Sequence, residues 1–196
     1  MNQTIYLASR SPRRVELLKQ IGFKCVVKPA DIDESALENE VPKDYVLRLA
    51  REKALACQQQ LGITCLNIPI LAADTTVALD DAILGKPVDD ADAFKMLKSM
   101  SGRKHEVHTA IAVAYHHDIE VALSSTVVEM MLLTDAMIND YIAAGEHLDK
   151  AGSYGIQGQA GAWIKHIQGS YSGVMGLPVF ETAQLLRNLS IKEFKV

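Results

Sequence analysis

The pattern of apolar and polar positions predicts that strands and helices follow one another along the chain. Short apolar runs predict the strands, and apolar residues spaced three or four positions apart predict amphipathic helices. The predicted strands cover residues 5–8, 25–27, 68–73, 106–115, 119–133 and 163–167, with a hairpin over 77–83. The predicted helices cover residues 12–21, 43–61, 90–100, 135–144 and 178–189.

The first strand leads into the sequence Ser-Arg-Ser-Pro-Arg-Arg at residues 9–14 and then into the first helix. Ser11 suits the N-cap, Pro12 the first helical position, and the free backbone N–H groups at that end favour an anion. Arg13 and Arg14 oppose the helix dipole by roughly 0.3–1 kcal/mol each. This local conflict predicts a polyanion, such as a phosphate chain, as the missing partner. The alternative is that the arginines are solvated or pair with carboxylates elsewhere.

The helix predicted over residues 43–61 carries a basic residue on its apolar side. Its apolar stripe contains Lys53 together with residues 46, 49, 50, 54, 57 and 61. A lysine in this position either extends to the surface at the edge of the core or points into a cleft. In a cleft it would supply a second phosphate contact.

The continuous apolar run over residues 68–73 predicts a strand buried on both faces that ends at Asp74. Functional groups in α/β sheets gather at the carboxyl ends of strands. Asp74 is therefore the best catalytic candidate, as a ligand for a divalent ion, a general base, or both. The alternative is an aspartate that only caps the next element. Glu34, in the acidic loop 31–34, could bind a hard cation or simply be solvated.

Two loops add further polar candidates. Lys86 lies between Gly85 and Pro87, which fix a loop and present the lysine. Gln157 lies in the glycine-rich segment 150–158, where the backbone can approach a ligand closely. Its amide offers both a donor and an acceptor to the edge of a nucleobase.

Composition narrows the class of protein. The 196 residues are 48% hydrophobic and 22% charged, with a net charge of −4 and a pI of about 5.9. An acidic chain of this kind argues against nucleic-acid binding, although a few local cations could still hold a small anionic ligand. The sequence suggests no leader and no membrane span, so we expect a cytoplasmic protein. The three cysteines, at 25, 57 and 65, lack metal spacing and are interpreted as reduced core thiols.

Several motifs, in order along nearly the whole chain, resemble those of the Maf family. They are Ser-Arg-Ser-Pro-Arg-Arg (9–14), Asp-Glu (33–34), Arg-Glu-Lys-Ala (51–54), Ala-Asp-Thr (73–75), Gly-Lys-Pro (85–87), Ser-Gly (101–102), Ala-Gly-Ser-Tyr-Gly-Ile-Gln-Gly (151–158) and Val-Met-Gly-Leu-Pro (174–178). The resemblance implies one domain over residues 1–196 with an α/β, ITPase-like fold. In this fold a long, mixed, twisted sheet is flanked by helices, and two lobes enclose a central cleft.

The same resemblance implies an activity and roles for individual residues. Members of the family are nucleoside triphosphate pyrophosphatases that cleave between the α and β phosphates with a divalent cation, Mg²⁺ or Mn²⁺. The implied catalytic carboxylate is Asp74, which would also bind the metal together with Glu34. The implied phosphate-binding residues are Ser9, Arg13, Arg14, Lys53 and Lys86.

Within the family, the chain resembles the branch that acts on dTTP and UTP. Arg13, Thr75 and Gln157 are the implied specificity residues, and a homodimer is implied as well. The alternatives are the branch that acts on 7-methyl-GTP, and a nucleotide-binding regulator of septum formation in which hydrolysis is incidental. Arg10 departs from the family motif, which often has a small residue there, and it adds charge beside the phosphate turn.

Overall fold

The structure is a computed structural model that describes residues 4–62 and 67–188. Its centre is one seven-stranded sheet in which β4 pairs only with β3 and the other strands follow the order β2-β1-β3-β5-β6-β7. The strands are β1 (Thr4–Leu7), β2 (Lys24–Val27), β3 (Ile70–Leu79), β4 (Ala82–Leu84), β5 (Lys104–Tyr115), β6 (Asp118–Met130) and β7 (Ile164–Gln168). β1 runs parallel to β2 and β3, and the remaining pairs are antiparallel, so the sheet is mixed as expected.

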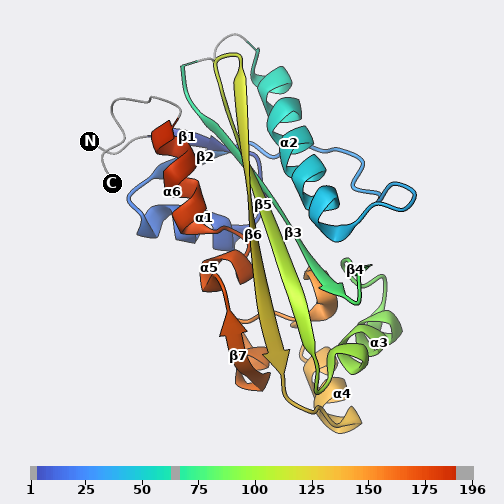
Figure 1. The fold of residues 1–196 in the computed structure, drawn as a ribbon. Coiled ribbons are helices and arrows are strands. Elements are labelled where there is room, and N and C mark those ends of the chain that lie inside the picture. The colour runs from blue at the N-terminus through green and yellow to red at the C-terminus, as the bar shows by residue number, and fades with distance from the viewer. Residues whose placement is uncertain (1–3, 63–66, 189–196) are drawn as a thin grey trace.

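Helices flank this sheet, which confirms the α/β class. They are α1 (Pro12–Gln20), α2 (Pro42–Leu61), α3 (Asp90–Met100), α4 (Asp135–Ala143), α5 (Tyr171–Val174) and α6 (Val179–Asn188), with 3-10 turns η2 (Ala151–Ser153) and η3 (Gln159–Trp163). Figure 1 shows α2 beside the upper part of the long β5–β6 ribbon, with α3, α4 and β7 near the lower end of the ribbon. None of the helices in the described part of the chain combines the length and apolar character of a membrane span.

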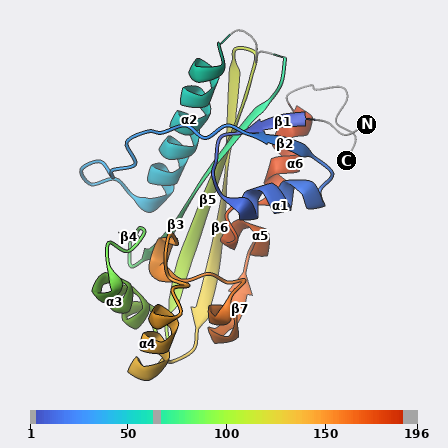
Figure 2. The same cartoon turned by 180° about the vertical axis from the view of Figure 1, so that it is seen from behind.

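The alternation of side chains along β3 sends neighbouring residues to opposite faces of the sheet. Ala72 packs in the cluster that contains the apolar stripe of α2, including Val46 and Ala54. Leu71 and Ala73 pack in the cluster that contains residues of α1 and α6. In the view from behind, α1 and α6 lie together on the side of β1 and β2 (Figure 2). By the same alternation, Asp74 faces α2 and Thr75 faces α1.

One edge of β3 is open at its middle. The register of β1 with β3 ends at the pair Leu7 and Leu71, and β4 begins to pair at Val77. Among the described residues, no strand pairs with this edge of β3 between those two points. The chain leaves β1 at this gap and enters the turn before α1, so the opening brings the turn next to Asp74.

The sequence prediction was wrong about where β3 ends. The strand does not stop at Ala73 but continues to Leu79, and Asp74 pairs in register with Ala110 of β5 in mid-strand. The polar triplet 74–76 interrupts the apolar run, yet the backbone ladder with β5 passes straight through it. The other predicted elements are confirmed with ends shifted by a few residues, such as Met130 instead of 133 for β6. The end of the last predicted helix, at residue 189, lies outside the described residues.

The cysteine interpretation holds in part. Cys57 is fully buried, whereas Cys25 is only partly buried. Cys65 lies outside the described residues.

Candidate active site

All nine residues predicted to form the site line one pocket of about 910 Å³. They are Ser9, Arg13, Arg14, Glu34, Lys53, Asp74, Thr75, Lys86 and Gln157. The pocket lies at the gap in the edge of β3 and is also lined by the 3-10 region that follows α4. These residues are separated by up to most of the chain length, so the fold itself brings them together.

The centre of the pocket is a buried lysine between two carboxylates. Lys53 Nζ lies 2.6 Å from Asp74 Oδ1 and 2.7 Å from Glu34 Oε1. Lys53 and Asp74 are only 9% and 7% exposed, whereas the Glu34 side chain is 47% exposed. Lys53 therefore points into the cleft from the apolar side of α2, rather than reaching the surface at its edge.

The surroundings shift the acidity of the two carboxylates in opposite directions. Burial raises the pKa of Asp74, and the nearby charges of Lys53 and Arg14 only partly oppose that rise. Burial also acts to raise the pKa of Glu34, but the hydrogen bond and charge of Lys53, helped by Lys86 and Arg14, outweigh it and lower the pKa. Asp74 is thus a stronger base than an ordinary aspartate, and Glu34 a weaker base than an ordinary glutamate.

Arg14 crosses the pocket from the first turn of α1. Its Nε donates to the Gly176 carbonyl at 2.8 Å, one NH group to Ser9 Oγ at 3.0 Å, and the other to Thr75 Oγ1 at 3.3 Å. Burial lowers the pKa of Arg14. Among the described residues no carboxylate lies within ion-pair distance of Arg14, so its hydrogen bonds go to neutral groups alone. A cation fixed in this way is well placed to receive an anion.

The remaining predicted residues lie around this centre. Arg13 Nε donates to the Met175 carbonyl at 3.4 Å, and Lys86 and Gln157 are exposed on the pocket wall. Thr75 Oγ1 is also 2.9 Å from Thr109 Oγ1, whose hydroxyl donates to the Gly173 carbonyl. Through Arg14, this chain of hydroxyl groups connects residues 9–14 to β3, β5 and α5.

The structure confirms Ser11 as the N-cap residue and decides between the alternatives for Arg10. Ser11 is at the N-cap position, but its side chain makes no capping hydrogen bond. Instead, the Ser11 N–H donates to Ser9 Oγ at 3.2 Å, which helps to place the hydroxyl that Arg14 contacts. Arg10 follows the alternative considered for the arginines, because it pairs with Asp31 at 2.8 Å on the surface.

Sequence patterns did not point to several side chains of the pocket wall, among them Tyr45, Glu146, Lys150 and Tyr154. The Tyr45 hydroxyl donates to the Glu34 carbonyl at 2.9 Å and so ties the acidic loop to α2. Tyr154 is buried, with its hydroxyl 2.7 Å from His105 Nε2. Tyr45 sits one position before Val46 of the apolar stripe, which was the available signal that it borders the core.

Among the described residues, no three or more histidine, cysteine, aspartate or glutamate side chains are grouped so that they could hold a metal ion. The pair Glu34 and Asp74 supplies two carboxylates that meet at one point. Magnesium sites of enzymes that act on phosphates often use one or two carboxylates and take their other ligands from phosphate and water. The donor set is therefore suited to such an ion only together with a phosphate ligand.

Comparison with known proteins places the chain among close relatives. It is 60% identical over 187 residues to a protein of Methylobacillus flagellatus named dTTP/UTP pyrophosphatase, with 95% of this chain and 93% of the relative covered. It is 46% identical over 194 residues to a protein of the same name from Pasteurella multocida, with 96% and 97% covered. A solved structure of the Staphylococcus aureus Ham1 protein aligns with a TM-score of 0.45 at 13% identity, covering 65% of this chain and 72% of that one.

The family model described as "Maf-like protein" matches residues 4–189, which is almost the whole chain. The chain belongs to the Maf-like protein family.

Proposed function

We propose that this protein is a nucleoside triphosphate pyrophosphatase that hydrolyses dTTP and UTP to the monophosphate and pyrophosphate with the help of a divalent cation. The observation that carries the proposal is the buried cluster in which Lys53 joins Asp74 and Glu34 beside the unpaired charge of Arg14. The names of the two relatives, at 60% and 46% identity over nearly full length, support the same activity.

In this proposal the cations of the pocket hold the triphosphate. Arg14 offers a fork of N–H donors whose present partners are neutral and exchange readily for phosphate oxygens. Arg13 and Lys86 add charge from the neighbouring walls, and Ser9 adds a hydroxyl. Charge stabilisation of this kind is the main protein contribution in phosphoryl transfer.

Asp74 is proposed to position and deprotonate the attacking water. Its Oδ1 accepts the hydrogen bond from Lys53, which leaves Oδ2 to accept a proton from water. The raised pKa of Asp74 makes it a better base near neutral pH than an ordinary aspartate. A divalent cation bound by Glu34, Asp74 and phosphate oxygens would neutralise charge that develops on the phosphates.

Arg13, Thr75 and Gln157 are proposed to set the choice of nucleotide. Gln157 lies on the exposed wall of the pocket, where its amide could pair with a uracil or thymine edge. Thr75 controls the geometry of Arg14 through their hydrogen bond. The proposal treats residues 1–196 as one cytoplasmic domain, and gel filtration distinguishes a monomer from the homodimer that the family resemblance suggests.

Pyrophosphate release from a panel of nucleoside triphosphates tests the proposal. The full chain is assayed with Mg²⁺ or Mn²⁺ on dTTP, UTP, CTP, GTP and 7-methyl-GTP, with EDTA as the control. We expect dTTP and UTP to be the best substrates and EDTA to abolish release. Preference for 7-methyl-GTP would assign the protein to the other branch of the family. Tight nucleotide binding without pyrophosphate release would favour a regulator of septum formation over an enzyme.

A further inference from the structure

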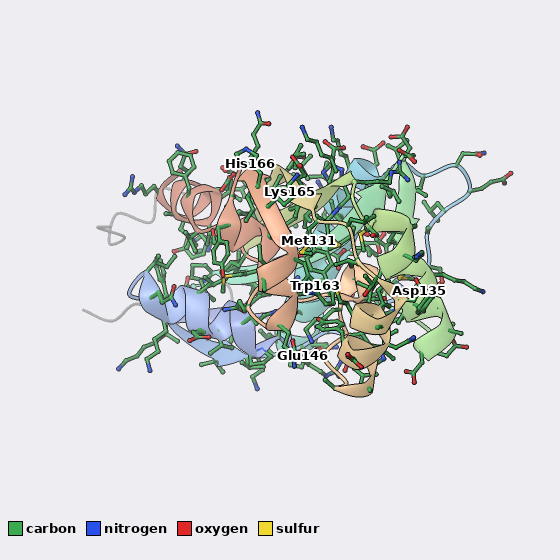
Figure 3. All side chains as sticks on the ribbon, turned by 90° about the horizontal axis from the view of Figure 1, so that it is seen from below. Met131, Asp135, Glu146, Trp163, Lys165 and His166 are labelled. Carbon is green, nitrogen blue, oxygen red and sulfur yellow. The ribbon has the colours of Figure 1, made fainter. Side chains whose placement is uncertain are left out.

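Glu146 is a charged residue of the pocket that the proposed chemistry does not use. It lies in the turn between α4 and η2, and its main chain is fixed from two sides. The Tyr141 hydroxyl donates to the Glu146 carbonyl at 3.4 Å, and the Lys150 ammonium donates to the same carbonyl. Figure 3 shows Glu146 where, in this view from below, α1 and α4 face each other. The backbone that carries this carboxylate is therefore well held.

The side chain of Glu146 reaches the segment that carries Gln157. Its Oε2 accepts a hydrogen bond from the Gln159 N–H at 3.0 Å. A Cβ atom on Gly158 would lie 1.9 Å from the same oxygen, so the carboxylate rests directly against the Gly158 backbone. Glycine is required at position 158 for this approach. The Glu146 carboxylate therefore lies against the residue that follows Gln157, and both Glu146 and Gln157 line the same pocket.

The charge of Glu146 is unexpected in a pocket for a triphosphate. Among the described residues, no lysine or arginine forms an ion pair with its carboxylate, in contrast to Glu34 and Asp74, which both contact Lys53. A carboxylate beside phosphates would weaken their binding. One that faces the base instead can accept a hydrogen bond, and Oε1 makes no hydrogen bond to the described part of the chain. Glu146 Oε1 is therefore suited to a ligand that presents a hydrogen-bond donor to it.

We propose that Glu146 is a specificity-determining residue that accepts a hydrogen bond from the ring N–H of uracil or thymine. These bases carry an N–H between two carbonyl groups, so Gln157 would donate to one carbonyl while Glu146 accepts from the N–H. Cytosine has an unprotonated ring nitrogen at that position and would direct a lone pair at the carboxylate. A site built around a substrate N–H strongly rejects analogues that lack it. This inference rests on the proposed function, because it names the base-recognition element of the same pocket.

Binding of nucleoside monophosphates tests the inference without any hydrolysis. Calorimetry on the full chain compares UMP, CMP and 3-methyl-UMP, in which a methyl group replaces the ring N–H. We expect the wild-type protein to bind UMP at least tenfold more tightly than either of the others. Equal binding of UMP and 3-methyl-UMP would overturn the inference, whatever a variant does.

The variant Glu146→Gln tests the residue itself, with Glu16→Gln on the exposed side of α1 as the matched control. A glutamine side chain can donate to the cytosine ring nitrogen as well as accept, so we expect the preference for UMP over CMP to narrow at least tenfold. The control should keep the wild-type preference. A variant that loses UMP and CMP binding equally, or that keeps the wild-type ratio, would reduce Glu146 to a structural support of the Gln159 turn and overturn the inference.

Hydrolysis of UTP and CTP by the same proteins separates this inference from the proposed function. If the protein discriminates between bases in binding but releases no pyrophosphate from any triphosphate, the proposed activity is wrong and the role of Glu146 in base recognition is kept. If pyrophosphate is released rapidly but Glu146→Gln leaves the choice between UTP and CTP unchanged, the proposed activity is kept and the role of Glu146 is wrong.

Discussion

The two ends of the pocket are built in different ways. At the end proposed to hold the phosphates, the phosphate end, Lys53, Asp74 and Arg14 project from α2, β3 and α1 and are fixed by hydrogen bonds or ion pairs. At the end proposed to recognise the base, the base end, Glu146 and Gln157 lie in the irregular segment between α4 and η3. Regular elements hold charged groups to a narrow geometry, whereas a loop can change its side chains with little effect on the sheet. In this arrangement the regular elements would hold the groups proposed for the reaction, and a separate irregular segment would set the selectivity for the base.

The sharpest test of the phosphate end is Asp74→Asn. Asparagine keeps the shape but cannot take a proton from water, so we expect kcat to fall by about a thousandfold or more, with nucleotide binding largely kept. Steady-state pyrophosphate release and calorimetry measure the two effects. Because burial raises the pKa of Asp74, the acid side of the wild-type pH–rate profile should lie above the range of an ordinary aspartate. Full activity in this variant would remove Asp74 from the reaction.

Asp81→Asn is the matched control for that substitution. Asp81 lies at the exposed tip of the β3–β4 hairpin with φ +66°, a conformation that asparagine also accepts. Its kcat should stay within twofold of the wild type. A large loss in both variants would point to general damage to β3.

Lys53→Met should reduce both activity and stability. Removing the ammonium leaves two carboxylates facing each other, one of them 90% buried in its side chain, so we expect about 3 kcal/mol of destabilisation at pH 8. Without Lys53 the pKa of Asp74 should rise further above its unfolded value. In the variant, the folded state then binds a proton at Asp74 more readily than the unfolded state does. The stability of the variant is therefore greater at low pH and is lost as pH rises through the pKa of Asp74 in the folded state.

Urea unfolding at pH 5 and pH 8 measures this difference. We expect the loss relative to the wild type to be smaller at pH 5 and the rate of pyrophosphate release to fall about a hundredfold. Lys43→Met, at the exposed first turn of the same helix, should change stability by no more than about 0.5 kcal/mol. An equal loss at both pH values would argue that the Lys53 stem matters through packing alone.

The residues proposed for the phosphate end were also the ones to which local sequence patterns pointed most directly, and the structure places them in one pocket. Arg13 and Arg14 opposed the helix dipole, and Lys53 interrupted an apolar stripe, so each broke a local rule that could be read without a structure. The position of Asp74 within β3 could not be read in this way. The polar triplet 74–76 looks like the end of an apolar run, and only the ladder with β5 shows that the strand continues.

The base end was predicted less well, for a physical reason. Glu146 breaks no local pattern, and the role proposed for it depends on which distant backbone groups its carboxylate meets. The same holds for Tyr45 at the phosphate end, where the hydroxyl meets the Glu34 carbonyl. Gln157 was found through its polarity in a glycine-rich segment and through family resemblance. The topology of the sheet, including the gap on β3 that opens the pocket, also depends on long-range pairing that periodicity does not encode.

Tyr45→Phe probes how firmly the acidic loop is tied to the phosphate end. The substitution removes the hydrogen bond to the Glu34 carbonyl, which is worth about 1 kcal/mol. We expect the Mg²⁺ concentration for half-maximal rate to rise about fivefold with little change in kcat at saturation. The pKa of Tyr45 is raised to about 12, so its hydroxyl stays a donor across the usual assay range and the effect should not depend on pH.

Tyr171→Phe is the control, since Tyr171 is half exposed and outside the pocket lining. Its metal dependence should match that of the wild type. An unchanged metal dependence in Tyr45→Phe would mean that Glu34 needs no fixed loop to act.

The smallest effect is expected for Arg10→Ala, although Arg10 lies beside the phosphate turn. Its guanidinium contacts Asp31 at 2.8 Å and 3.2 Å, and the two side chains are 68% and 80% exposed. Exposed ion pairs contribute about 0–1 kcal/mol, and this one holds the charge of Arg10 in solvent. We expect kcat/KM to change less than twofold in Arg10→Ala.

Asp31→Asn releases Arg10 from this pair. A fall in KM for UTP in Asp31→Asn, with no change in Arg10→Ala, would show that Asp31 restrains a cation able to reach the phosphates. A tenfold loss of kcat/KM in Arg10→Ala would instead place Arg10 among the phosphate-binding residues. The phosphate end would then include an exposed side chain as well as the buried ones.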